Sequence, residues 1–222
     1  SFDANLTIFP DKQLADYRSN ITGHPDSVNI RKQQMDTRGL DISFIIDQLE
    51  KLQNGSIKST LNGKLDLQKI AVAGHSYGGS TATVAAHKDE RIKACAVLDS
   101  WLSPVPEPII SAGIHVPFLF MGRPTWEGSD YPGNYPRLDS LLAHSSEPKY
   151  RMVIKNTLHQ DYTDIPLFSP IIEYVMQVGD LSPEISLTLI NRLTHGFLDK
   201  HLLGRNGKKF DQILMNNLII RF

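Results

Sequence analysis

Several features that define other classes of protein are missing or rare in this sequence. Cys95 is the single cysteine, so a disulfide within the chain is impossible. No apolar run approaches the roughly 18 residues that a membrane-spanning helix needs. Charge is balanced, with 23 basic against 24 acidic residues and a formal net charge of −1. These absences argue against a disulfide scaffold, a transmembrane span and a nucleic-acid partner.

The sequence does suit one globular domain over residues 1–222. With 222 residues, 41% of them hydrophobic, the chain can bury a sizeable core. Cys95 lies between two alanines in an apolar run, which predicts a buried packing role. The chain begins Ser1-Phe2-Asp3, without an initiator Met or a signal peptide, so we expect a processed or excised piece.

Three N-glycosylation sequons begin at Asn5, Asn20 and Asn54. They matter only in a eukaryotic secretory protein, and chance occurrence in an Asn-rich chain is an equally good interpretation. An extracellular location is our expectation, while use of the sequons stays open.

The chain divides into a lead-in and a region with clear periodicity. Residues 1–35 show no clear periodicity, so we expect them to be rich in loops, with one short helix as an open alternative. From Asp36 onward apolar residues recur at spacings of three and four, which predicts a helix with one apolar face. That face consists of Ile42, Ile45, Ile46, Leu49 and Leu52.

Short apolar runs then alternate with helical patterns. Four runs are typical of strands buried on both faces of a parallel sheet, namely residues 69–74, 94–98, 116–121 and 151–155. The helical patterns are residues 79–87, 138–143, 171–178 and 183–203. This alternation predicts an α/β fold over residues 36–222, with a mainly parallel sheet and flanking helices.

The sharpest signal is Gly74-His75-Ser76-Tyr77-Gly78-Gly79, which contains the nucleophile elbow G-x-S-x-G. In this elbow a strand turns sharply into a helix and exposes the Ser hydroxyl at the carboxyl edge of the sheet. The glycines are expected because the tight turn leaves no room for side chains. A phosphate-binding loop fits poorly, since no Lys follows the glycines. Ser76 is therefore the predicted nucleophile.

A serine needs a base to take its proton. In α/β-hydrolases, where this elbow occurs, the catalytic residues follow one another along the chain in the order Ser, acid, His. Of the eight histidines, His159 alone follows a strand at the edge where Ser76 is expected. The others precede or adjoin the serine, lie in helical or polar segments, or enter at the opposite edge. His159 is therefore the predicted base.

Position leaves the acid open. Asp99 ends the strand 94–98, and Asp130 follows the next strand, where many α/β-hydrolases place their acid. Asp161 and Asp164 are too close to His159 in sequence for the usual geometry. Asp99 and Asp130 are near-equal candidates on these grounds.

Three motifs together resemble the plasma-type platelet-activating factor acetylhydrolases of the α/β-hydrolase superfamily. They are the elbow, Leu98-Asp99-Ser100-Trp101, and His159-Gln160-Asp161-Tyr162-Thr163-Asp164. The resemblance runs from about Asp36 to Leu203. It implies that the acid is the Asp of the Leu-Asp-x-Trp motif, here Asp99, and that the substrates are short-acyl phospholipids. Trp101 of the same motif is a candidate for substrate binding.

The predicted reaction is hydrolysis of a carboxylic ester through an acyl-enzyme. His159 draws the proton from Ser76, and Asp99 orients the imidazole and stabilises its charged form. Backbone N–H groups hold the oxyanion, one of them from Tyr77. No cofactor is needed, and no cluster with metal-ligand spacing is visible. A generic small-ester, polyester or dienelactone-type hydrolase stays open, as does a catalytically silent half-fold that acts as an interaction module.

The chain departs from the full fold before the elbow. An α/β-hydrolase places several strands there and takes its second oxyanion donor from a loop after an early strand. Such strands are not recognisable before Ser76. We therefore expect the C-terminal part of a longer fold, completed by the parent chain, in which the strand 69–73 has one open edge.

The apolar segment 170–176 follows the His159 loop. The favoured interpretation is a helix packed into the core. The alternative is a helix that dips its apolar face into a lipid surface and feeds the site, so that the protein makes peripheral contact with lipid.

Overall fold

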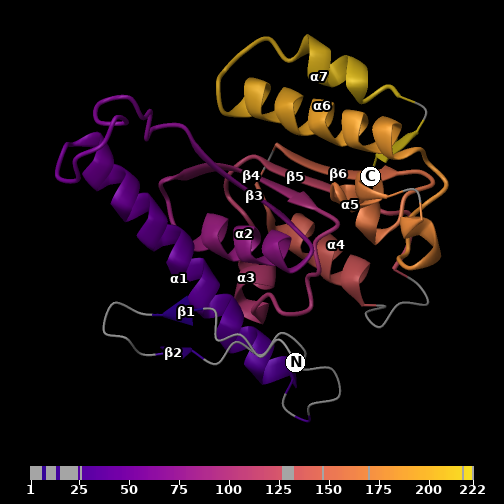
Figure 1. Cartoon of the computed structure of the whole chain (residues 1–222), viewed down its shortest axis with the longest axis horizontal. Coiled ribbons are helices and arrows are strands. Elements are labelled where there is room, and N and C mark those ends of the chain that lie inside the picture. The colour runs from indigo at the N-terminus through magenta and orange to yellow at the C-terminus, as the bar shows by residue number, and fades with distance from the viewer. Residues whose placement is uncertain are drawn as a thin grey trace.

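The computed structural model of the chain describes residues 7–8, 14–15, 25, 27–126, 133–146, 148–169, 171–216 and 218–221. A five-stranded sheet forms its centre, with helices on both faces (Figure 1). In spatial order its strands are β3 (Ile70–His75), β4 (Ile92–Leu98), β5 (Phe118–Gly122), β6 (Lys149–Ile154) and β7 (Ile219–Arg221). The first four are parallel, and β7 is antiparallel to β6. The predicted α/β fold with a mainly parallel sheet is confirmed.

Helices α1 to α4 lie on one face of the sheet, and α6 and α7 lie on the other (Figure 1). The helices are α1 (Ser27–Gln53), α2 (Tyr77–Lys88), α3 (Glu107–Ala112), α4 (Asn134–His144), α5 (Ile165–Phe168), α6 (Pro183–His201) and α7 (Lys208–Ile213). Two 3₁₀ turns, η1 (His159–Tyr162) and η2 (Ile172–Tyr174), flank α5. A separate antiparallel pair joins β1 (Thr7–Ile8) to β2 (Leu14–Ala15).

Each face of the sheet carries its own hydrophobic core. In β4, Cys95 and Val97 pack under α1 to α4, whereas Ala94 and Ala96 pack under α6 and α7. Strand side chains alternate between faces, so a sheet covered on both sides needs apolar residues at every position. This is why the strands stand out in the sequence as continuous apolar runs. Cys95 is fully buried, as predicted, and burial raises the pKa of its thiol.

Helix α1 begins at Ser27, nine residues before the predicted start at Asp36, so the expectation of a loop-rich lead-in is wrong for residues 27–35. Its first turns are polar and contribute few apolar contacts, among them the buried Met35, so no periodicity marks them. The predicted apolar face is also only partly right, since Ile46 is buried but Ile45 is 55% exposed.

The predicted helix at residues 171–178 is only the short turn η2, and its packing into the core is wrong. Ile171 is 65% exposed and Tyr174 is 79% exposed, while Pro170 lies outside the described residues. The chain is drawn back to the sheet directly afterwards, because Leu181 N–H donates to the backbone oxygen of Asn156 after β6. Between α5 and this bond the chain forms only η2, with these side chains exposed.

Strand β3, which leads into the elbow, has one strand neighbour within the part of the chain that the structure describes. That neighbour is β4, paired in parallel along the whole of β3. The prediction of an open edge is therefore confirmed for these residues. None of the helices in the described ranges combines the length and apolar character that crossing a membrane requires.

Candidate active site

The elbow between β3 and α2 has the strained geometry that the motif predicts. Ser76 has a φ of 55°, in the left-handed region that non-glycine residues rarely adopt. A Cβ on Gly74 would lie 2.3 Å from the backbone oxygen of Gly78, and one on Gly79 would lie 2.7 Å from the Ser100 Cβ. Both positions therefore require glycine. We also predicted that Gly78 leaves no room for a side chain. That prediction is wrong, because a Cβ on Gly78 would meet no described atom within 4 Å.

Helix α1 holds the elbow through the side chain of Tyr77. The Tyr77 hydroxyl donates to the backbone oxygen of Arg31 at 2.8 Å, and the Arg38 guanidinium lies 4.9 Å from the centre of the ring. The Tyr77 backbone remains at the first position of α2, directly after Ser76. The N–H groups of a first helical turn have no acceptor within their helix, so they suit an oxyanion.

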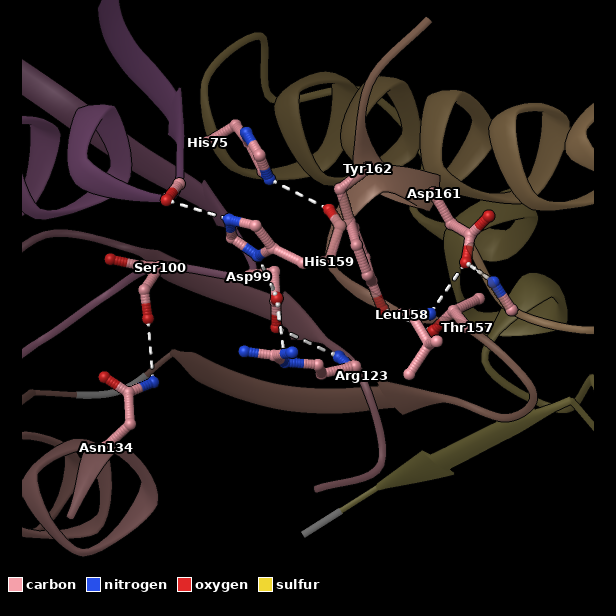
Figure 2. Close-up of polar contacts among 12 residues, drawn as sticks. His75, Asp99, Ser100, Arg123, Asn134, Thr157, Leu158, His159, Asp161 and Tyr162 are labelled. Atoms are coloured by element: carbon pink, nitrogen blue, oxygen red, sulfur yellow. Dashed lines mark hydrogen bonds and ion pairs between the residues drawn. The ribbon is translucent and has the colours of Figure 1, made fainter. Parts of the chain in front are cut away.

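The structure brings Ser76, His159 and Asp99 together from three separate elements. Figure 2 shows the His159 ring beside Asp99. His159 opens the turn η1 after β6, and Asp99 follows β4. The His159 Nε2 lies 3.0 Å from the Ser76 Oγ, and its Nδ1 lies 2.6 Å from the Asp99 Oδ2. Asp99 is fully buried. This order of contacts is the one in which an imidazole can take a serine proton while a carboxylate holds the ring.

The loop after β4 is fixed by contacts that the sequence did not reveal. Asn134, at the start of α4, accepts a hydrogen bond from Leu102 N–H at 2.6 Å and donates to the backbone oxygen of Ser100 at 2.9 Å. Trp101 N–H donates to the backbone oxygen of Ser76 at 3.1 Å, and its ring stands 5.9 Å from that of Tyr77. Trp101 therefore lies beside the elbow, where a substrate contact stays a prediction.

Arg123 is a second unpredicted neighbour of Asp99. Its backbone N–H donates to Asp99 Oδ1 at 3.1 Å, and its Nε lies 3.2 Å from Asp99 Oδ2. The guanidinium stacks on Trp126, 3.8 Å from the ring centre. Arg123 directly follows β5, just as Asp99 directly follows β4. Its position at the carboxyl end of a strand could therefore have identified it from the sequence. The alternative acid Asp130 lies outside the described residues.

His75 is also part of the site, although it precedes the serine and sequence position set it aside. Its Nε2 lies 3.1 Å from the backbone oxygen of His159, and the two rings are 4.5 Å apart. Burial, and then the nearby His159, lower the pKa of His75 to about 4. The His75 imidazole is therefore neutral near pH 7, and its Nε2–H donates to the His159 carbonyl.

Asp161 holds the turn that carries His159. Its Oδ2 accepts a hydrogen bond from Leu158 N–H at 2.6 Å (Figure 2). It also accepts one from Gly179 N–H at 2.7 Å, which ties the turn to the segment before α6. Burial raises the pKa of this carboxyl group. As expected, Asp161 does not occupy the position of the acid. Among the described residues, His, Cys, Asp and Glu form no group of three that could hold a metal ion.

Comparison with known proteins agrees with this geometry. The sequence profile of the family "Platelet-activating factor acetylhydrolase, isoform II" matches residues 10–217, which is most of the chain. The chain belongs to this family. The three motifs that suggested the family therefore lie within a match that extends well beyond them.

Curated members of the platelet-activating factor acetylhydrolase family are similar over much of this chain. The platelet-activating factor acetylhydrolase of Canis lupus familiaris is 27% identical over 88% of the chain and 45% of its own length. That of Bos taurus is 32% identical over 79% of the chain and 36% of its own length. The chain thus spans about half or less of the length of these relatives.

Among solved structures, a ferulic acid esterase from Streptomyces cinnamoneus is similar with a TM-score of 0.72 and 21% identity. The match covers 97% of this chain and 62% of that structure. At this identity the likeness concerns the fold alone, and it supports an α/β-hydrolase architecture.

Proposed function

We propose that this chain carries the catalytic site of a serine hydrolase of carboxylic esters. The observation that carries the proposal is the continuous contact from Ser76 Oγ through the His159 imidazole to the buried Asp99. Ser76 attacks the ester carbonyl while His159 takes its proton, and Asp99 keeps the ring in the required tautomer. The leaving alcohol takes that proton from His159, and a water activated in the same way then releases the acid from Ser76.

We assign the oxyanion of each tetrahedral intermediate to two backbone N–H donors, one of which lies at the elbow. Tyr77 N–H is one of them, because it follows the nucleophile at the start of α2. In this fold the second donor belongs to a loop after an early strand. We propose that a longer parent chain supplies it together with the strand that pairs with the open edge of β3.

The relatives' length and the outer face of α1 support this extension of the fold. The canine relative is matched over 45% of its length. Leu40, Phe44 and Ile45 of α1 are more than half exposed, which is unusual for large apolar side chains on one helix. A further layer of chain beside β3 would cover them.

Short-acyl phospholipids are the substrates we propose, because the curated relatives are named as acetylhydrolases of platelet-activating factor. A short-acyl phospholipid and a simple acetate ester can carry the same acyl group, so they differ in the alcohol that leaves. Hydrolysis rates for a short-acyl phospholipid and for an aryl acetate distinguish the two. A strong preference for the aryl acetate at equal concentration would favour a generic esterase.

An exposed apolar surface supports contact with lipid near the site. It consists of Leu167, Phe168, Ile171, Tyr174, Val175 and Met176, all of them at least 37% exposed, and we call it the 167–176 surface. The surface follows the turn that holds His159. Apolar side chains gathered on short turns beside a site suit insertion into the interfacial layer of a membrane. We therefore propose that the peripheral lipid contact predicted for residues 170–176 is made by the 167–176 surface.

Substitution of this surface tests the lipid contact. Ile171→Asp with Val175→Asp should lower binding to phosphatidylcholine vesicles at least about tenfold, since charge insertion into apolar lipid is costly. Thermal stability should change little because both side chains are exposed. Ile57→Asp with Leu61→Asp is the matched control, as it adds the same two charges at exposed apolar residues in the loop between α1 and β3. Unchanged vesicle binding with lowered stability would contradict the proposal.

Secretion also belongs to the proposal. Asn54 of one sequon is exposed in the turn after α1, whereas Asn5 and Asn20 lie outside the described residues. An exposed turn is the kind of position at which an Asn-x-Ser sequon is modified. A mobility shift on glycosidase treatment, lost in Asn54→Gln, tests this.

A fluorophosphonate probe tests the proposed catalysis directly, because it labels only an activated serine. Labelling at Ser76 is expected, and Ser76→Ala should abolish it. Asp99→Asn should cut turnover by about 10⁴-fold because it favours the wrong tautomer of His159. Asp130→Asn is the matched comparison, and a larger loss there would identify Asp130 as the acid. Absence of labelling in the full-length protein would favour a catalytically silent interaction module.

A further inference from the structure

A positively charged group contacts the same carboxylate oxygen as His159. Figure 2 shows Asp99 between His159 and Arg123, and its Oδ2 lies 2.6 Å from His159 Nδ1 and 3.2 Å from Arg123 Nε. A Ser-His-Asp site needs the bond to histidine but no cation on its carboxylate. The guanidinium therefore has a consequence of its own for the charge of the site.

The position of the guanidinium is fixed by its surroundings. It stacks on Trp126, whose ring stands edge-on to His159 at 5.8 Å, and the backbone oxygen of Arg123 accepts a hydrogen bond from the Tyr135 hydroxyl. Arg123 is only 8% exposed. An arginine is always charged, and salt screens a buried charge weakly. Its charge is therefore weakly screened and constant with pH.

The other titratable groups that face His159 stay neutral or are turned to other partners near neutral pH. His75, from β3, has its pKa lowered to about 4. Burial raises the pKa of Tyr162 on the same turn and of Tyr135 on α4, so both phenols are uncharged. Asp161 bonds two backbone N–H groups instead. Asp99 and Arg123 are thus the charges in direct contact with this network.

We propose that Arg123 is a positioning residue that extends the working range of the site to lower pH. The inference rests on the proposed esterase function. The guanidinium takes up part of the negative charge of Asp99, and its own charge repels the protonated form of the imidazole. His159 therefore accepts the Ser76 proton at a lower pH than it would beside an unshared carboxylate. The consequence is weaker stabilisation of the imidazolium that forms in the transition state.

The pH profile of kcat/KM for an aryl acetate tests the effect of the Arg123 charge on the working pH range of the site. Arg123→Met keeps much of the length and loses the charge, whereas Arg123→Lys keeps the charge. We expect the acid limb of the profile to move up by about one pH unit in Arg123→Met, the size typical of removing one charge close to a titrating group. Arg123→Lys should stay near the wild-type limb. Lys93→Met is the matched control, because it removes an exposed positive charge at the opposite end of β4.

The low-field proton resonance of the imidazole bonded to Asp99 provides a readout that needs no turnover. Its change with pH should move in the same direction and by the same amount in Arg123→Met. Activity that falls equally at every pH, with an unmoved limb and an unmoved resonance, would overturn the proposal, because Arg123 would then only hold Asp99 in place. A limb that moves equally in Arg123→Lys would overturn it too.

The two proposals fail separately. A wild-type protein that neither turns over nor is labelled at any pH refutes the esterase function. The resonance still reports the effect of the Arg123 charge on the imidazole in that case.

Discussion

At the scale of single residues, the proposed catalysis depends on two hydrogen bonds in series, from serine to histidine and from histidine to aspartate. Neither bond works alone, because the serine is a poor nucleophile until the imidazole takes its proton. Ser76→Ala and His159→Ala should each lower turnover of an aryl acetate by about 10⁴-fold or more, and the double variant should be little worse than either. Losses that add independently would show that the two residues do not act as one unit.

Stability should depend on pH through His75. Its pKa is about 4 in the folded chain, against about 6.5 for an unperturbed histidine. Between these values the unfolded chain binds a proton at this position that the folded chain does not, so stability rises with pH across this range. The contribution is complete above pH 6.5 and is lost as the pH falls toward 4. Urea midpoints at pH 7 and pH 5 measure it.

His75→Asn removes this titration and should make the loss of stability between pH 7 and pH 5 smaller. His144→Asn is the matched control, because His144 is exposed at the end of α4 and should leave the difference as it is. An unchanged difference in His75→Asn would show that the burial of His75 does not govern the acid sensitivity.

At the scale of elements, α6 covers one face of the sheet through a few large side chains. Phe197 is fully buried and meets Tyr150 of β6 edge-on, with ring centres 6.1 Å apart. Phe197→Ala should lower the free energy of unfolding by about 3–5 kcal/mol, through lost burial and the cavity it leaves. Ile185→Ala on the same helix should cost about 0.5 kcal/mol or less, because Ile185 is half exposed. Similar losses at both positions, measured by urea unfolding, would contradict this account of α6.

At the scale of the whole molecule, we expect the open edge of β3 to govern how the chain associates. Unpaired N–H and C=O groups beside apolar side chains favour pairing with another chain. Sedimentation of residues 1–222 should therefore show self-association, and Ala73→Lys, which adds a charge at an exposed position of β3, should reduce it. The isolated chain should also be about 10²-fold less active than a version extended to the length of the relatives, the loss typical of one missing oxyanion donor. A monomeric wild-type chain with full activity would contradict both expectations.

Ala73→Lys should be unfavourable in the extended protein, although it reduces self-association of residues 1–222. In the proposed longer fold β3 pairs on both sides, so Ala73→Lys should destabilise the extended protein. Leu61→Lys, at an exposed position in the loop before β3, is the matched control and should affect neither protein.

The sequence by itself determined the sheet and the order of the candidate site. Strands buried on both faces must be continuously apolar, so β3 to β6 are visible as runs, and the elbow between β3 and α2 requires a local pattern of glycines. Position along parallel strands then placed His159, and left Asp99 and Asp130 open until the family motif favoured Asp99. Strand β7 was not predicted because three residues are too few to show an alternating or continuous apolar pattern. The first turns of α1 were not predicted because they are largely polar.

Only the tertiary structure decided what surrounds these residues. Arg123, His75 and Asp161 act through contacts between segments far apart in the chain, and no local pattern encodes which strand ends meet. The exposure of the 167–176 surface depends in the same way on the return of the chain to Asn156, not on its own apolar sequence. An apolar run predicts burial in general, but the connections around it decide whether the core, another chain or a lipid surface covers it.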